Sequence, residues 1–111
     1  MRYMLLICHD SSFTARTVKG DSAAWLEEME RRGVRKHGDR PRPASEAKTV
    51  SMHDGKLLVR DGPFADTKEE VAGYDIIECV DFDEAIEIAS KHAAAKFGII
   101  EIRPVWQKAA S

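Results

Sequence analysis

The chain has 111 residues and a mass of 12.4 kDa, and its 43% hydrophobic and 32% charged residues are typical of one small globular domain, not of a disordered segment. The 17 Lys and Arg against 19 Asp and Glu give a net charge of -2, which argues against nucleic-acid binding because phosphate recognition needs a concentrated basic patch. No apolar run approaches the roughly 20 residues of a membrane span, and no signal peptide is evident, so we expect a cytoplasmic protein.

The first predicted strand, residues 2–8, is apolar on both of its faces. A strand of this kind is usually buried on both sides. Helices of the same chain can cover one face, and we expect a second copy to cover the other, because a chain this small buries only a modest core. The two alternating sets are Tyr3, Leu5 and Ile7 on one face and Met4, Leu6 and Cys8 on the other.

A polar loop over 9–20 precedes a helix predicted for residues 22–32, which Gly33 ends in the left-handed conformation. The apolar stripe of this helix is formed by Trp25, Leu26 and Met29. Residues 38–43 contain two prolines and are predicted to be irregular.

Two strand-like runs, 47–53 and 56–60, flank the dipeptide Asp54-Gly55. This pattern predicts a β-hairpin, because a type I′ turn needs positive φ at both central residues. A further strand is predicted for 71–80.

A second helix, residues 83–95, is predicted to begin at the capping residue Asp81, and a last strand covers 99–103. The order of elements predicts an α+β fold: a ferredoxin-like βαββαβ subunit with an extra hairpin strand. Two helices are expected to cover one face of the antiparallel sheet, and residues 1–111 to form a single domain.

The string Asp61-Gly62-Pro63-Phe64, continued to residue 69, is unusual. Together with 72–74 and 98–104 it closely resembles the DGPF branch of the YCII-related proteins, over nearly the whole chain. The resemblance implies a homodimer that pairs sheet against sheet as a dimeric α+β barrel. It also implies a functional link to an extracytoplasmic-function sigma factor, because some members are encoded beside or fused to one.

The chain departs from YCII-related proteins in one respect. Many of them resemble one another in a His on the first helix that pairs with an Asp, but the helix predicted for 22–32 contains no His. The acid–base pair suggested for the family therefore cannot be carried over to this chain.

His9, Asp61 and Asp75 are the candidate catalytic residues, expected within mutual reach on the open side of the sheet near the 61–69 loop. Each has a plainer reading. His9 could be an ordinary polar residue at a strand end, and Asp61 could bond to backbone N–H groups of its own turn. Asp75 could lie between subunits with a raised pKa, or be solvated at an edge.

Phe64, Lys68, Glu69 and Arg103 are the candidate ligand-binding residues. The alternatives are a core or interface plug for Phe64, exposed helix-start charges for Lys68 and Glu69, and a structural ion pair with Glu101 for Arg103.

We expect no metal and no cofactor. Cys8 and Cys79 lack CxxC spacing and are predicted to be buried thiols, with a disulfide between them left open, and no histidine pair has ligand spacing. Two function classes remain: a small-molecule-binding or regulatory homodimer, or a cofactor-free enzyme of the lyase, isomerase or hydrolase type. The sequence leaves open whether the protein is catalytic.

Overall fold

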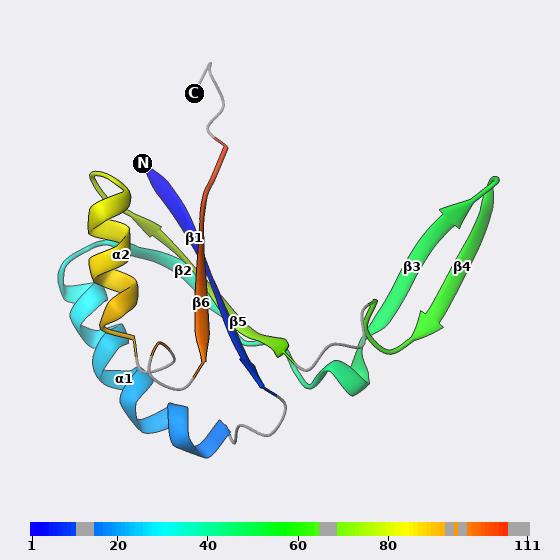
Figure 1. Cartoon of the computed structure of the whole chain (residues 1–111), viewed down its shortest axis with the longest axis horizontal. Helices are drawn as coiled ribbons and strands as arrows, with labels where there is room; N and C mark the ends of the chain where they lie inside the picture. Colours follow the sequence, from blue (N-terminus) through cyan, green and yellow to red (C-terminus); the bar gives the residue numbers. More distant parts are fainter. Residues whose placement is uncertain (11–14, 65–68, 93–94, 96–97, 107–111) are drawn as a thin grey trace.

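The computed structural model describes residues 1–10, 15–64, 69–92, 95 and 98–106 (Figure 1). Its main body is an antiparallel sheet with the strand order β2-β5-β1-β6. The strands are β1 (Arg2–Asp10), β2 (Arg35–Asp39), β5 (Glu69–Glu78) and β6 (Ile99–Pro104). Helices α1 (Ala15–Arg31) and α2 (Phe82–Ser90) cover one face of this sheet (Figure 1). The predicted α+β class is confirmed.

The core lies between the helices and the sheet. Tyr3, Leu5 and Ile7 of β1 are buried on this side, as the alternation predicted. The helices also bond to each other, because the indole Nε1–H of Trp25 donates to the carbonyl oxygen of Ile88 at 2.9 Å. The remaining members of the buried cluster are Met29, Ile77, Cys79, Ala85 and Ala89.

Both helices differ in length from the prediction. Strand β1 continues to Asp10 and helix α1 begins at Ala15, so the loop expected over 9–20 is wrong for residues 9–10 and 15–20. Gly20 and Asp21 are weak helix formers, which is why the sequence placed the start after them. Helix α2 ends at Ser90, five residues earlier than predicted, and it buries Ile88.

Strand β2 was not expected. Residues 35–39 are all polar or glycine, so they carry no apolar alternation, and the sequence assigned 38–43 to an irregular segment. Their strand conformation comes from pairing with β5, in which His37 lies opposite Ile76 and Gly38 opposite Asp75.

The predicted hairpin is confirmed as β3 (Lys48–His53) and β4 (Lys56–Asp61), with positive φ at Asp54 (49°) and Gly55 (77°). It does not join the main sheet, however, but forms a two-stranded sheet of its own that projects away from the body (Figure 1). The predicted hairpin is therefore present but lies outside the main sheet. We call residues 48–61 the arm. A short 3-10 helix, Ala44–Glu46, lies just before its base.

Candidate functional site

A buried ion pair joins the edge strand β2 to its neighbour β5. The Arg35 guanidinium donates from Nε to Oδ1 of Asp75 at 2.8 Å, and Asp75 is only 5% exposed. A second carboxylate, Glu30 of α1, lies 3.6 Å from Arg35. The pair therefore lies on the helix-covered side of the sheet and fixes β2 against both β5 and α1.

Burial raises the pKa of Asp75, and this effect outweighs the opposing hydrogen bond and charge of Arg35. The face that Asp75 shares with Ile77 and Cys79 packs against the helices. Neither alternative considered from the sequence, an inter-subunit face or a solvated edge, describes it, because the sequence could not show which alternating set of β5 the helices cover.

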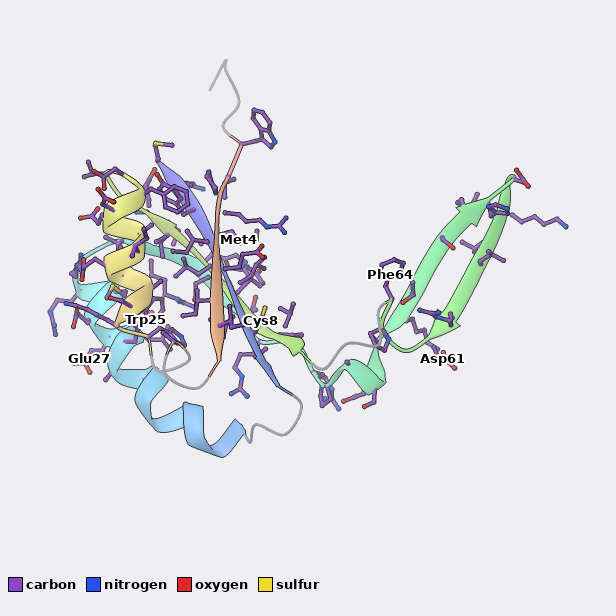
Figure 2. All side chains as sticks on the ribbon, in the orientation of Figure 1. Met4, Cys8, Trp25, Glu27, Asp61 and Phe64 are labelled. Carbon is purple, nitrogen blue, oxygen red and sulfur yellow. The ribbon has the colours of Figure 1, made fainter. Side chains whose placement is uncertain are left out.

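Within the described part of the chain, the other face of the sheet carries apolar side chains and no helix covers it (Figure 1). We call it the open face. Met4 lies opposite Ile76, and Cys8 opposite Val71 and Ile99. Met4, Cys8 and Ile76 are half-buried, whereas Val71 and Ile99 are more than 50% exposed. Figure 2 shows Met4 and Cys8 on the side of the sheet away from the helices.

A polar group borders the open face where β2 pairs with β5. The Tyr74 hydroxyl and Nε2 of His37 share a hydrogen bond of 2.6 Å, and the two rings meet edge to face at 5.4 Å. Oδ2 of Asp39 lies 4.0 Å from the same Nε2. Tyr74 is opposite Leu6 in the strand pairing, so this group adjoins the apolar part of the open face.

This arrangement can hold a polar ligand group. Imidazole nitrogens and a phenolic hydroxyl both donate and accept hydrogen bonds, and a nearby carboxylate favours a ligand that brings a proton donor. His37 and Asp39 side chains are 59% and 73% exposed, so they are accessible in the single chain.

The structure does not bring the expected catalytic residues together within one chain. Asp61 lies at the base of the arm, bonded to Lys48, with its side chain 85% exposed (Figure 2). Asp75 belongs to the other sheet. His9 is part of β1, but its side chain lies outside the described residues.

The expected ligand-binding residues are also dispersed. Phe64 is 84% exposed, so within one chain it is not the core plug that was considered. Arg103 is paired with Glu101 on the open face, as the structural alternative predicted. Lys68 and the side chain of Glu69 lie outside the described residues.

Sequence reasoning missed Arg35 and His37 as site residues. Residues 35–39 are all polar or glycine, so they carry no alternation that marks a strand. A register shift between Arg35 and His37 also places their side chains on opposite faces of the sheet, and only the pairing with β5 brings them to Asp75 and Tyr74.

Among the described residues, no group of three or more His, Cys, Asp or Glu side chains could hold a metal ion. No helix in the same part of the chain is long and apolar enough to cross a membrane. No disulfide joins Cys8 and Cys79, and Cys79 is buried as predicted whereas Cys8 is half-buried.

Comparison with known proteins gives two matches. The model of the YCII-related domain family matches residues 1–108. The chain is also 32% identical over 114 residues to an uncharacterized protein, R00369, of Rhizobium meliloti (strain 1021), covering 95% of this chain and 92% of the relative.

Proposed function

This chain belongs to the YCII-related domain family, and from that membership and the geometry above we propose that it is a small-molecule-binding homodimer. Its subunits are ferredoxin-like, and their open faces pack together as a dimeric α+β barrel. The strand order β2-β5-β1-β6 with antiparallel neighbours and helices on one face supports this topology. The Asp61-Gly62-Pro63-Phe64 string supports membership of the DGPF branch.

The observation that carries the binding function is the His37–Tyr74 hydrogen bond at the border of an apolar sheet face. A second copy packed on the open face would shield this polar group from water, and shielding strengthens hydrogen bonds to a ligand. The chemistry fits a small organic molecule with an apolar body and a hydroxyl or carboxylic acid group.

A ligand screen tests the binding function. We expect members of a library of small aromatic and aliphatic hydroxy acids to raise the melting temperature of the wild type. Tyr74→Phe removes only the hydroxyl and His37→Asn removes the imidazole, and each should weaken a hit by about tenfold, as the loss of one ligand hydrogen bond predicts. His53→Asn, on the exposed arm tip, is the control. A hit that binds equally to all four proteins would contradict the assignment.

Sedimentation tests the homodimer. Leu6 is half-buried on the open face, whereas Leu5 is fully buried beneath the helices, so Leu6→Asp is the informative change. Burying an unpaired carboxylate between two sheets costs several kcal/mol, so the variant should sediment as a monomer. Ser90→Asp, at the exposed end of α2, should leave the mass unchanged. A monomeric wild type at micromolar concentration would overturn the dimer.

A cofactor-free enzyme is the second candidate, because a phenol and an imidazole 2.6 Å apart can transfer a proton. His9, Asp61 and Asp75 stay proposed catalytic residues, and Phe64, Lys68, Glu69 and Arg103 proposed ligand contacts. Asp75 is buried beneath the helices, so a dimer through the open faces would bring only exposed members of this set, such as Asp61, Phe64 and Arg103, near a second subunit. Following a bound hit by NMR over hours separates the classes: its conversion indicates an enzyme, and its persistence a binding protein.

A regulatory link to an extracytoplasmic-function sigma factor also belongs to this proposal, supported by the resemblance of residues 61–69 to the DGPF branch. Joint elution of the two proteins in gel filtration would support the link. Separate elution with and without a ligand hit would remove it.

A further inference from the structure

The arm has one apolar and one largely polar face. Directly opposed residues of an antiparallel pair share a face, and in the arm Val50 faces Val59 while Met52 faces Leu57. All four side chains are 57–67% exposed. The opposite face carries Leu58 among polar side chains: Thr49, Ser51, His53, Lys56 and Arg60.

The apolar face of this hairpin has no packing partner within the described part of the chain. Two strands alone are marginally stable in water, and an apolar face needs a surface to pack on. Figure 1 shows the arm pointing away from the body, and Figure 2 shows no part of the body over its side chains. The arm therefore presents an interaction surface.

The dimensions of the chain lead to the same conclusion. A compact domain of this length has a radius of gyration of about 13 Å, whereas this chain has 16.1 Å and extends over 46 × 43 × 18 Å. The shape is that of a subunit whose packing is completed by another molecule.

We propose that the arm is an exchange element whose apolar face, Val50, Met52, Leu57 and Val59, packs against a second copy of this chain. The proposal rests on the homodimer proposed above and names a second contact within it. In a two-fold dimer each copy contributes one arm and contacts the other copy's arm, so a second copy covers the apolar face of the arm as well as the open face.

Charge favours a second copy as the occupant. The arm carries Lys48, Lys56 and Arg60 against Asp54 and Asp61, so it is net positive. The whole chain is net -2, so the rest of the chain is the negative part. An arm of one copy is thus complementary in charge to the body of the other.

Hydrogen bonds hold the base of the arm in one conformation, which fixes the direction in which the arm projects. The Gly62 N–H donates to the Ala47 carbonyl oxygen at 2.8 Å, and the Thr49 hydroxyl donates to the Gly62 carbonyl oxygen at 2.8 Å. The Arg60 guanidinium donates to the carbonyl oxygens of Pro63 and Phe64. A preorganised arm loses less conformational entropy when it binds.

Site-specific photocrosslinking of the purified full chain tests the contact. A benzophenone side chain at position 57 lies on the apolar face and should give a covalent dimer on irradiation. The same group at position 51 lies on the opposite face and is the matched control, from which we expect no covalent dimer. Equal yields from both positions, or none from position 57, would overturn the proposal, as would a different protein trapped by position 57 in a lysate.

Substitution separates this proposal from the dimer itself. Val59→Asp places a carboxylate on the apolar face and should raise the dimer dissociation constant by about tenfold or more, as an unpaired buried charge predicts. Ser51→Asp should leave it within about twofold. The indole NMR signal of the buried Trp25 reports that the body of each variant is folded.

The outcomes are distinct. If Leu6→Asp dissociates the dimer and Val59→Asp does not, the arm proposal fails and the sheet-to-sheet dimer stands. If the wild type is monomeric, both fail. If both variants dissociate it while Ser51→Asp does not, both contacts are supported.

Discussion

Position 38 accepts only glycine, for a reason that lies in the buried ion pair. A Cβ atom added there would lie 2.2 Å from Oδ1 of Asp75, 2.6 Å from Nη2 of Arg35 and 2.7 Å from the carbonyl oxygen of Tyr74. One of these obstacles is backbone and another is the buried carboxylate, so neither can move aside cheaply. The glycine lets the β2 backbone pass over the Arg35–Asp75 contact.

Gly38→Ala should therefore lower the free energy of unfolding by about 2 kcal/mol or more, by overpacking a buried site. Chemical denaturation measures the change. Gly33→Ala is the comparison, because Gly33 has φ +71° and open space around it, so its loss costs only backbone strain of about 1 kcal/mol. Equal costs at the two positions would contradict the clash.

His92 supplies a pH-dependent term in stability. Its ring is buried against Trp25, with centroids 4.7 Å apart, and burial lowers its pKa below the ordinary 6.5. The unfolded chain takes up the proton near pH 6.5, whereas the folded chain resists it until lower pH. The folded state is thus favoured above pH 6.5 and loses this advantage as the pH falls towards the lowered pKa.

We expect the free energy of unfolding to fall from about pH 7.5 to about pH 5.5, and to fall less steeply in His92→Gln. His53→Gln, a change of an exposed histidine in the arm, should keep the wild-type slope. The raised pKa of Asp75 has the opposite sign, because it favours the folded state at lower pH, so the informative quantity is the difference between the wild type and His92→Gln. Identical slopes would contradict the role of His92.

Among the proposed site residues, the sequence drew attention to Asp75 but not to its partner. A carboxylate within an apolar strand is visible in the sequence, because it interrupts the pattern. Arg35 and His37 lie among other polar residues, and only the pairing of β2 with β5 brings them to Asp75 and Tyr74. Contacts between residues this distant in the chain have no local signal.

At the scale of elements, the features with local causes were predicted well. The Asp54-Gly55 turn is determined by its own residues, and so are the alternation of Ile100 and Ile102 in β6 and the capping of α2. Strand β2 depends on its pairing with β5, so composition and periodicity did not predict it. The separate position of the arm also has no local cause, because a hairpin's pattern does not say which sheet it joins.

The start of α2 provides a test of one local cause. Oδ1 of Asp81 accepts the Glu84 N–H at 2.9 Å, and Oε1 of Glu84 accepts the Val80 N–H at 2.9 Å. Asp81→Ala should cost about 1 kcal/mol by leaving the Glu84 N–H without its cap. Asp83→Ala removes a carboxylate from the same turn without removing the cap, and it should cost about 0.5 kcal/mol or less. Thermal unfolding followed by circular dichroism measures both, and a larger loss at position 83 would contradict the capping role.

At the scale of the whole molecule, the sequence predicted that β1 has a second apolar face, and the open face bears this out. In the proposed dimer, a second copy of the chain covers the open face. A folded state that depends on a second copy is stabilised by mass action.

The melting temperature should therefore rise with protein concentration between about 1 and 100 μM, because unfolding of the dimer separates two chains and dilution favours the separated state. Leu6→Asp should melt at a lower temperature that no longer varies with concentration. Calorimetry at several concentrations measures both effects. A wild-type melting temperature independent of concentration would contradict a dimer that stabilises the fold.

The closed base of the arm has a consequence for how this fold can vary. A backbone hydrogen bond joins Gly62 to Ala47 at the base of the arm. The positions at which the chain leaves and re-enters the main body therefore do not depend on the length of the hairpin between them. An insertion of two residues in β3 and two in β4 would lengthen the hairpin by one repeat of the strand and keep every side chain on its face. An insertion of one residue in each strand would move the side chains beyond the insertion to the opposite face of the hairpin. Natural or engineered length variants of the arm should therefore differ by two residues per strand. The distance over which the arm of one subunit extends across the other would then change in fixed increments.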